Sequence, residues 1–328
     1  MITVIGSLNL DLVTYTEEAP QAGETVQGDF FEEHLGGKGM NECVASASLS
    51  KPERRSEVRM WGRLGDDRQA ELFLSKLRAL NVDTSLLEQV SDVRTGTASI
   101  TVEETNGENR IIIVSGANGH MKPSDEELGD AFTLGSSDQK QYAVLQNEFP
   151  NPVKVINWLA ESRPEVVKFY NPSPLKPEML DRTTLNNVEY LIVNRGEAWS
   201  LINNIIGESK DADSLQEKDE NTLVISRLRK FLSRPTLIVT LGSKGCIYSL
   251  PKDNPDNYGF VPSRKVANIV DTTGAGDTFL GAIVARLYEG VPLKDALIFA
   301  TAASSLAIQR KGAVEGIPMY EDVCRIIR

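Results

Sequence analysis

Short apolar runs alternate with segments of helical periodicity along most of the chain, and this alternation limits the fold more than any other feature. The runs expected to form strands occupy residues 2–6, 58–61, 142–145, 166–170, 190–193, 237–240 and 245–250. Between them, apolar residues recur every three or four positions over residues 66–80, 152–161 and 274–288. This pattern predicts an α/β fold with a mostly parallel sheet and helices on both faces. Ligands bind such sheets beyond the carboxyl ends of the strands.

Two regions interrupt the alternation, because each contains apparent strands with no helix after them. Residues 12–33 contain two strands around a turn at residues 20–23, and residues 95–115 contain two strands around Asn106 and Gly107, a strong hairpin signal. We expect these regions to form one small antiparallel sheet that projects as a lid. Decoration of the surface is the alternative that the pattern leaves open. The acid-rich residues 207–221 are expected to be a solvated loop or the charged surface of a helix.

Charge and the rare residue types exclude several classes of function. The 328 residues include 35 Lys and Arg against 46 Asp and Glu, a net charge of −11 that repels a nucleic-acid backbone. Three scattered cysteines fit a reducing compartment, and two histidines cannot furnish a His-rich zinc site. The sequence has no signal-peptide pattern and no apolar run long enough to span a membrane. We therefore expect a cytoplasmic protein, with room for an additional nuclear pool, and no nucleic-acid or membrane partner.

The segment most informative about chemistry is residues 271–279, Asp-Thr-Thr-Gly-Ala-Gly-Asp-Thr-Phe. Its small residues precede an apolar helical pattern, so their backbone N–H groups are expected at a helix N-terminus, where they can bind an anion. Asp277 lies at the same end, placed to accept a proton from a hydroxyl that attacks a phosphoryl group. The competing interpretation is an Asp that only caps the helix. A dinucleotide-binding motif would need Gly at position 279, where Phe stands, and the chain has no P-loop motif.

A second glycine cluster, residues 36–39, leads into a helical run over residues 41–49. Its glycines let the backbone approach a ligand closely, and Lys38 and Asn41 offer hydrogen-bond donors at the helix start. Taken alone, such a cluster is more often a flexible turn.

These two segments resemble the C-terminal and N-terminal signatures of the ribokinase (PfkB-type) family of carbohydrate kinases. Further similar segments follow in the family's order along essentially all 328 residues. They are residues 6–11, 145–148, 171–174, 194–197, 240–245 and 310–313. The resemblance implies a single kinase domain over residues 1–328. It also implies a ribokinase-like three-layer sandwich, with a mostly parallel central sheet between helices and a small protruding β-sheet lid formed by residues 12–33 and 95–115.

The resemblance implies which residues bind and activate the sugar. Asp277 is similar to the family's catalytic base, which takes the proton of the sugar's primary hydroxyl, and Gly274, Ala275 and Gly276 are similar to its anion hole. The positions similar to sugar-binding residues are Asn9, Asp11, Gly37, Lys38, Asn41 and Glu148, together with Asp277. Carboxylates and amides of this kind suit the hydroxyls of a polyol. For Asp11 or Glu148 alone, a solvated or capping carboxylate would be the ordinary interpretation.

The resemblance also implies a site for ATP and Mg²⁺. The positions similar to nucleotide-binding residues are Asn194, Thr240, Leu241, Gly242, Ser243, Lys244, Gly245, Gly276, Asp277 and Thr301. Glu197 matches a carboxylate linked to the Mg²⁺ shell, and one indirect carboxylate suits an ion that keeps several waters. Without the resemblance, Glu197 would be interpreted as a first-turn helix carboxylate and residues 240–245 as a hairpin turn.

A monovalent-cation site, usually filled by K⁺, accompanies the anion hole in this family. The positions similar to its ligands are Asp271, Thr273, Ala307, Arg310, Gly312 and Gly316. A side-chain hydroxyl is common at the last position. Glycine cannot supply that oxygen, so a carbonyl or a water would have to complete the coordination.

The function that the resemblance implies is ATP-dependent phosphorylation of D-ribose at the 5-hydroxyl, which gives ribose 5-phosphate and ADP. A kinase for another neutral sugar or for a nucleoside is an alternative, and so is a sugar-binding regulator without catalysis. Family members use such a lid to cover the sugar and often to pair two subunits. The resemblance therefore also implies a homodimer formed through the lid sheet.

Overall fold

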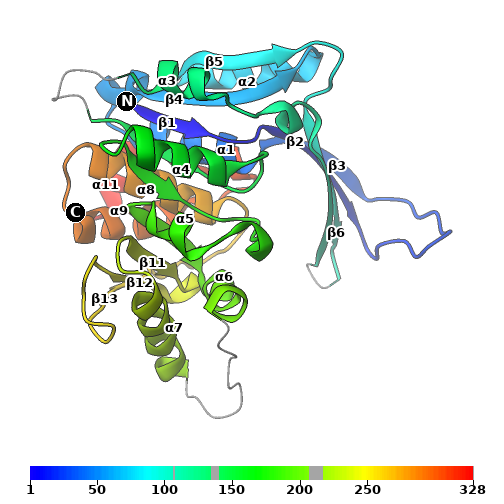
Figure 1. Ribbon diagram of the computed structural model, residues 1–328. Coiled ribbons are helices and arrows are strands. Elements are labelled where there is room, and N and C mark those ends of the chain that lie inside the picture. The colour runs from blue at the N-terminus through cyan, green and yellow to red at the C-terminus, as the bar shows by residue number, and fades with distance from the viewer. Residues whose placement is uncertain (106–107, 134–139, 207–216, 328) are drawn as a thin grey trace.

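The main body of the protein is a large sheet covered by helices on both faces, and a smaller sheet projects from one side of it (Figure 1). The computed structural model describes residues 1–105, 108–133, 140–206 and 217–327. In the described chain the large sheet has the strand order β13-β12-β11-β10-β9-β8-β1-β4-β5. The strands from β11 to β5 in this order are parallel, whereas β12 and β13 add an antiparallel edge. The predicted α/β fold is confirmed.

Every strand predicted for the main body is present, with its ends within a few residues of the expected ones. The strands of the large sheet are β1 (Ile2–Ile5), β4 (Val58–Gly65), β5 (Asp83–Val90), β8 (Tyr142–Leu145), β9 (Val167–Tyr170), β10 (Tyr190–Asn194), β11 (Thr236–Thr240), β12 (Gly245–Ser249) and β13 (Gly259–Pro262). The sequence pattern missed β5 and β13. Both lie at the edges of the sheet, where half-burial weakens the apolar pattern.

The helices divide between the two faces of the sheet according to the buried cluster that they join. One face is covered by α1 (Lys38–Ser48), α2 (Arg68–Ala79), α8 (Ala275–Tyr288), α9 (Leu293–Ala307), α10 (Ala313–Gly316) and α11 (Tyr320–Ile327). The other is covered by α3 (Asp125–Ala131), α4 (Pro152–Ser162), α5 (Arg182–Asn186), α6 (Arg195–Leu201) and α7 (Glu217–Phe231). Shorter helical turns are η1 (Pro52–Glu57), η2 (Gly116–His120), η3 (Pro177–Met179), η4 (Ile202–Ile206) and η5 (Gly242–Lys244). None of the described helices is long and apolar enough to cross a membrane.

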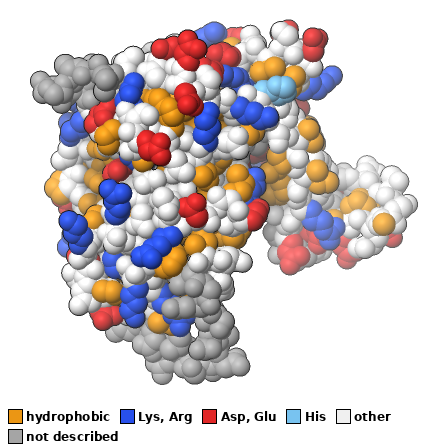
Figure 2. Space-filling model, viewed as in Figure 1, with side chains coloured by type: hydrophobic (Ala, Val, Ile, Leu, Met, Phe, Trp, Pro, Cys, Tyr) orange, Lys and Arg blue, Asp and Glu red, His pale blue; other side chains and the backbone are white. Residues whose placement is uncertain are grey.

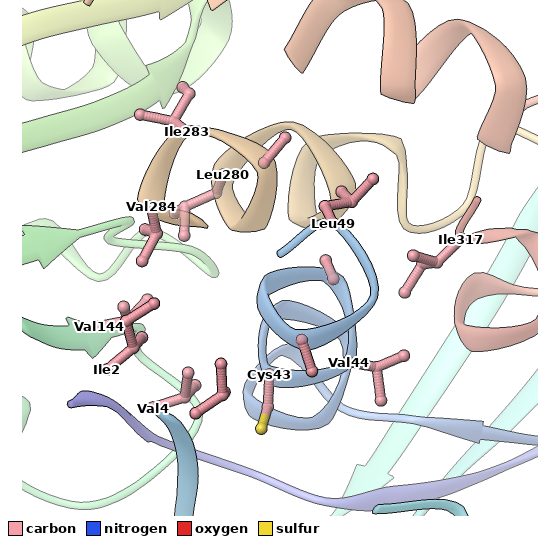
Figure 3. Close-up of a cluster of buried hydrophobic side chains, with 14 of the residues drawn as sticks. Ile2, Val4, Cys43, Val44, Leu49, Val144, Leu280, Ile283, Val284 and Ile317 are labelled. Atoms are coloured by element: carbon pink, nitrogen blue, oxygen red, sulfur yellow. The ribbon is translucent and has the colours of Figure 1, made fainter. Parts of the chain in front are cut away.

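The core beneath α1 and α8 fixes these two helices against β1. Ile2 and Val4 of β1 point into this cluster, while Ile5 joins the cluster on the opposite face, as a strand buried on both sides requires. Figure 3 shows α1 surrounded by side chains of β1, β8 and α8. The helices cross closely, because a Cβ on Gly281 of α8 would lie only 2.4 Å from the Cβ of Ala45 in α1.

The projecting sheet is built from both regions that interrupt the strand–helix alternation. Its strands are β2 (Asn9–Thr16), β3 (Phe30–Gly36), β6 (Gly96–Glu103) and β7 (Asn109–Val114), in the order β3-β2-β6-β7. The prediction of a wholly antiparallel sheet is wrong, because β2 and β6 pair in parallel. Both strands run outward from the main body in the same direction, so they can only meet side by side in parallel. Asn106 and Gly107, and most of the 207–221 stretch, lie outside the described residues.

Candidate active site

The predicted sugar-binding residues come from chain segments that meet at the carboxyl ends of β1 and β8. Asn9 opens β2 just after β1, and Glu148 follows β8. Lys38 and Asn41 lie in the first turn of α1, and Asp277 lies in the first turn of α8. The molecular surface is hollowed between the main body and the lid (Figure 2). The structure thus brings residues from both ends of the chain to one place, as expected for a parallel sheet.

Asp277 is held between two side chains of α1. Asn41 Nδ2 donates a 2.7 Å hydrogen bond to Asp277 Oδ2, and Lys38 Nζ lies 3.6 Å from Asp277 Oδ1. Asp277 is only 7% exposed. The carboxylate of Asp277 raises the pKa of Lys38 above its ordinary value, despite the opposing effect of burial. Lys38 is therefore a fixed cation beside the carboxylate.

Glu148 fastens the start of α1 to the end of β8. Its Oε2 accepts a 2.8 Å hydrogen bond from the Lys38 backbone N–H and a 2.6 Å hydrogen bond from Ser7 Oγ. The chain can turn into α1 here because Gly37 adopts a φ of 86°, a left-handed conformation that glycine tolerates without strain. The carboxylate thus joins the predicted glycine cluster to the strand end.

Asn9 and Asp11 lie on β2 at the base of the lid. Asn9 Oδ1 accepts a 2.8 Å hydrogen bond from Asn118 Nδ2, which orients its amide. Asp11 lies against Gly36 of β3, where an added Cβ would come within 2.1 Å of Asp11 Oδ2. Burial, followed by the nearby Glu148 carboxylate, raises the pKa of Asp11 to about 7. This carboxyl therefore titrates near neutral pH.

The predicted anion hole is the N-terminal turn of α8. Gly274 precedes the helix with a φ of 72°, and Ala275 and Gly276 form its first positions. Gly276 has open space around it, since an added Cβ would meet no atom within 4 Å. Ser304 of α9 anchors the turn by donating a 2.9 Å hydrogen bond to the Ala275 carbonyl. The N–H groups of such a turn can bind negative charge, and that of Ala275 also donates a 3.3 Å hydrogen bond to the Thr272 carbonyl oxygen.

Two segments that carry the predicted monovalent-cation ligands lie together beside α8. Asp271 accepts 2.9 Å hydrogen bonds from the backbone N–H groups of Thr273 and Gly312. Burial would raise the pKa of Asp271, but a hydrogen bond from the Thr273 side chain, together with these two backbone hydrogen bonds, outweighs it and holds the pKa below its ordinary value. An added Cβ on Gly316 would lie 3.1 Å from the Ala307 carbonyl oxygen and 3.8 Å from that of Arg310.

This donor set fits a large monovalent cation. Carbonyl oxygens can replace the hydration shell of such an ion. Position 316 faces two carbonyl oxygens, those of Ala307 and Arg310. A side-chain oxygen at this position would point toward them, and glycine supplies none.

Lys311 fastens the lid to residues 307–316, the segment that carries four of the predicted cation ligands. Its Nζ lies 2.7 Å from the Glu32 carboxylate of β3, 4.6 Å from the centre of the Tyr15 ring and 4.8 Å from that of Phe30. The two rings are stacked on each other with their centres 4.1 Å apart. A link therefore runs from the lid to the segment that carries the predicted cation ligands.

The predicted nucleotide-binding positions lie farther along the same edge of the sheet. Residues 240–245 connect the antiparallel strands β11 and β12 through η5, so the hairpin interpretation is correct. A cavity of about 590 Å³ opens beside this connection, lined by Asn221, Thr222, Leu241, Lys244, Ile247, Tyr258 and Phe260. Thr301 lies in α9, where its hydroxyl donates a 2.9 Å hydrogen bond to the Ile298 carbonyl within the helix.

Asn194 and Glu197 form a capping box at the start of α6. Glu197 Oε2 accepts a 2.9 Å hydrogen bond from the Asn194 backbone N–H, and Asn194 Oδ1 accepts a 2.8 Å hydrogen bond from the Glu197 N–H. The first-turn interpretation of Glu197 is therefore correct. The described residues contain no cluster of three or more His, Cys, Asp or Glu side chains placed to hold a metal ion. A single carboxylate fits Mg²⁺ only as an ion that keeps most of its waters and binds the phosphates of a nucleotide.

Sequence reasoning missed several residues that position this site. Ser7 supports Glu148, Asn118 orients Asn9, and Ser304 anchors the anion-hole turn. The segments around Ser7 and Gln146 were singled out, but nothing in the sequence indicated which side chains they meet. Gln146 Nε2 donates a hydrogen bond to Oε2 of Glu42, a fully buried carboxyl that follows Asn41 in α1.

Comparison with known proteins identifies the family. The pfkB family carbohydrate kinase domain matches residues 1–319, and the chain belongs to this family. A ribokinase of Schizosaccharomyces pombe is 36% identical over 328 residues, covering 98% of this chain and 96% of the relative. A ribokinase of Lactococcus lactis is 36% identical over 326 residues, covering 98% of this chain and 95% of the relative.

Solved structures agree with the fold over the whole chain. A ribokinase from Cryptococcus neoformans in complex with ADP matches with a TM-score of 0.80 and 28% identity, covering 99% of both chains. An Arabidopsis thaliana ribokinase complexed with ribose and ATP matches with a TM-score of 0.80 and 26% identity, covering 100% of this chain and 98% of the other. The ribokinase-like fold predicted from the sequence is confirmed.

Proposed function

We propose that the protein phosphorylates D-ribose at the 5-hydroxyl with ATP, giving ribose 5-phosphate and ADP. The observation that carries the proposal is the environment of Asp277, a carboxylate fixed by Asn41 and Lys38 at the N-terminus of α8. Relatives of the same length at 36% identity are ribokinases, and one matching structure holds ribose and ATP. The chain is accordingly proposed to be a single kinase domain over residues 1–328 that works in the cytoplasm.

In the proposed reaction, the sugar's 5-hydroxyl oxygen attacks the γ-phosphorus of ATP, and the bond from that phosphorus to the β–γ bridging oxygen breaks. Asp277 accepts the hydroxyl proton, and ADP leaves with the bridging oxygen. The N–H groups of Gly274, Ala275 and Gly276 bind the charge on the transferring phosphoryl group. Asn41 holds one Asp277 oxygen by a hydrogen bond, which leaves the other carboxylate oxygen nearer to Lys38.

The remaining sugar hydroxyls are proposed to bind the polar groups at the base of the lid. Asp11 and Glu148 accept hydrogen bonds, and the amides of Asn9 and Asn41 both donate and accept. The backbone of Gly37 lets the sugar approach closely. Lys38 donates to the sugar, and its Nζ forms an ion pair with Asp277 Oδ1 at 3.6 Å. This set of amides, carboxylates and one lysine suits an uncharged sugar.

ATP is proposed to lie across the β11–β12 connection, with Asn194, Thr240, Leu241, Gly242, Ser243, Lys244, Gly245 and Thr301 around it. The cavity beside Leu241 and Lys244 supports this placement. When bound with ATP, Mg²⁺ neutralises charge on the phosphate oxygens. Glu197 would hold the Mg²⁺ ion through a water molecule. Among the described residues, only one hydrogen bond, from the Asn194 N–H, reaches Glu197 Oε2, so its carboxylate can still accept a hydrogen bond from that water.

A K⁺ ion is proposed to be held by oxygens of Asp271, Thr273, Ala307, Arg310 and Gly312, with a water or carbonyl near Gly316. When bound, the ion supplies positive charge that orders the turn before Gly274. Asp271 supports this arrangement, because its carboxylate already ties residues 271–273 to Gly312.

A homodimer is proposed to form through the lid sheet. Its edge strands are β3 and β7, and both expose apolar side chains. The exposed fractions are 54% for Phe31, 52% for Ile111 and 70% for Ile112. An exposed apolar strand at a sheet edge is a ready surface for pairing with a second copy. Ile112→Lys should shift the molar mass measured by light scattering from dimer to monomer.

The proposed activity is tested by measuring ADP release with Mg-ATP on ribose, 2-deoxyribose, arabinose, fructose and adenosine, each with and without K⁺. Turnover that is strongest on ribose supports the proposal. Turnover that is strongest on another substrate would support the proposed role of Asp277 but contradict the assignment of ribose as the substrate. Ribose binding without ADP release would instead support a sugar-binding regulator.

A further inference from the structure

Glu42 is a fully buried carboxyl directly beneath the proposed catalytic residues. It follows Asn41 in α1 and lies one helical turn after Lys38. Its Oε2 accepts a hydrogen bond from Gln146 Nε2. Its Oε1 and the Gln146 Oε1 are both buried, and neither has a hydrogen-bond partner among the described residues. An ionised Glu42 would leave both of these acceptor oxygens without a donor, and unpaired buried acceptors are strongly unfavourable.

A proton on Glu42 would remove this mismatch. A carboxylic acid and a primary amide each carry one donor and one acceptor, so two of them can form a reciprocal pair. In such a pair Glu42 Oε1–H donates to Gln146 Oε1, while Gln146 Nε2–H donates to Glu42 Oε2. The bond from Gln146 Nε2 is already present, and the two unpartnered atoms are the ones that the second bond would join.

The charges that face Glu42 also favour its neutral form. Asp277 of α8 and Glu148 after β8 are carboxylates, and Lys38 in the first turn of α1 is the cation among them. Cys43, next to Glu42 in α1, is fully buried. Burial, followed by the Asp277 carboxylate, raises the pKa of Glu42 well above its ordinary value.

The pair joins the two segments that carry the site. Gln146 lies two residues before Glu148, which binds the Lys38 backbone N–H, and Glu42 lies next to Asn41, which binds Asp277. The amide oxygen of Gln146 also lies against the backbone of Gly6, where an added Cβ would come within 2.1 Å of it. Little freedom is left for either side chain.

We propose that Glu42 is a positioning residue that works as a neutral carboxylic acid, paired reciprocally with Gln146 so that the first turn of α1 holds Lys38 and Asn41 against Asp277. The pair acts through Asn41 and Lys38 and touches no substrate. Ionisation of Glu42 would break one of its hydrogen bonds and place a third carboxylate beside Lys38.

The first test measures stability and does not depend on the proposed kinase activity. A folded protein that keeps a proton which the unfolded chain releases loses stability as pH rises. The ordinary pKa of this carboxyl is 4.5. Above that value, the folding equilibrium constant of Glu42→Gln relative to wild type should increase by about tenfold per pH unit. Denaturant unfolding between about pH 5 and pH 8 measures this, with the exposed Glu165→Gln as the control. A ratio that stays constant with pH would overturn the proposal.

Infrared difference spectra give a second reading of the same proton. Wild type minus Glu42→Gln should contain the C=O stretching band of a protonated carboxylic acid, and wild type minus Glu165→Gln should lack it. A carboxylate band in its place would show that Glu42 is ionised.

Kinetic tests rest on the proposed function and separate positioning from simple stability. Glu42→Gln can make the same reciprocal pair, so its kcat should stay close to that of wild type. Any decline in the wild-type kcat at alkaline pH that Glu42 ionisation causes should be absent from this variant. Gln146→Glu places two carboxyl groups together and should lower kcat/KM by at least about tenfold. The double variant Glu42→Gln with Gln146→Glu restores one acid and one amide, and it should recover most of that loss. Failure of the exchanged pair to recover activity, in a variant that folds normally, would count against the positioning role. Absence of activity in the wild type would reject only the proposed function.

Discussion

Asn41 Nδ2 donates a 2.7 Å hydrogen bond to Asp277 Oδ2, although 236 positions separate the two residues in the chain. The bond joins the first turns of α1 and α8, and the helix crossing one turn further along makes it possible. There Ala45 meets Gly281, where an added Cβ would lie 2.4 Å from the Ala45 Cβ. Because residues four apart share one helix face, this glycine sets the distance at which Asn41 meets Asp277.

Replacing Asp277 by Asn should nearly abolish turnover while ribose binding remains measurable. The amide keeps the shape of the carboxylate but cannot accept the proton, so kcat should fall by about 10²–10⁴-fold. ADP release measures kcat, and titration calorimetry measures ribose binding. Asp295→Asn, an exposed first-turn Asp of α9, is the matched control and should behave as wild type. Full activity of Asp277→Asn would remove Asp277 from the mechanism.

Ribose affinity should weaken as pH falls through about 7. Burial and Glu148 raise the pKa of Asp11 to about 7, so the carboxylate is present above this pH and protonated below it. If the carboxylate accepts sugar hydrogen bonds, the apparent ribose affinity should decrease as pH falls below the pKa of Asp11. The decrease should approach about tenfold for each pH unit. Calorimetric titrations at several pH values measure this. In Asp11→Asn the affinity should be lower and should change little over the same range.

The same pKa shift predicts how Asp11 affects stability. The folded pKa of about 7 lies above the ordinary value of 3.8, so the folded state binds more protons than the unfolded state between these values. The contribution of Asp11 to the free energy of unfolding is therefore fully present below about pH 4 and is lost as pH rises toward 7. Asp11→Asn should gain stability relative to wild type across this window. A gain that is independent of pH would contradict the assignment.

Replacing Lys311 by Met should loosen the lid with little effect on stability. The ion pair with Glu32 is partly exposed, with side-chain exposures of 42% and 28%, and such pairs contribute less than about 1 kcal/mol. We expect a several-fold higher KM for ribose and faster amide hydrogen exchange in β3. Lys294→Met, an exposed lysine of α9, is the control. Unchanged exchange in β3 would indicate that other contacts hold the lid.

Replacing Gly316 by Ser should strengthen the response to K⁺. The new Cβ would lie 3.1 Å from the Ala307 carbonyl oxygen, a tight contact that a small shift can accommodate. The hydroxyl would add an oxygen ligand, so half-maximal activation should occur at a lower K⁺ concentration. The rise in melting temperature with K⁺ relative to Na⁺ provides a readout besides activity, and Gly316→Ala controls for the added Cβ. Equal responses of the Ser and Ala variants would place the cation elsewhere.

The parts of the fold that sequence reasoning predicted are those with strong local patterns. β1 and β8 are continuous apolar runs buried on both faces, and α8 follows an evident glycine turn. β5 was missed because it begins with Asp83, Thr84 and Ser85 and is only partly buried. An edge strand with polar residues carries little of the apolar signal.

The contacts that complete the site have no local signal at all. Asn118 and Asn9 are 109 positions apart, and Gln146 and Glu42 are 104 apart. Residue types and motif spacing indicated that Asn9 and Asn41 matter, but only the folded chain specifies what orients them. The parallel pairing of β2 with β6 was missed for the same reason. The relative direction of these two strands depends on where the chain leaves the main sheet before each of them.

β2 is one continuous strand of eight residues, from Asn9 and Asp11 at the sugar end to Thr16 at the far end. A strand of this length spans about 25 Å and bends little, so it can act as a lever arm. A small rotation at the sugar end becomes a larger displacement at the exposed residues beyond the far end. A pair of spectroscopic labels, one at the exposed Gln21 and one at the exposed Glu165 of the main body, would therefore turn ribose binding into a distance change that can be measured without following the chemical reaction.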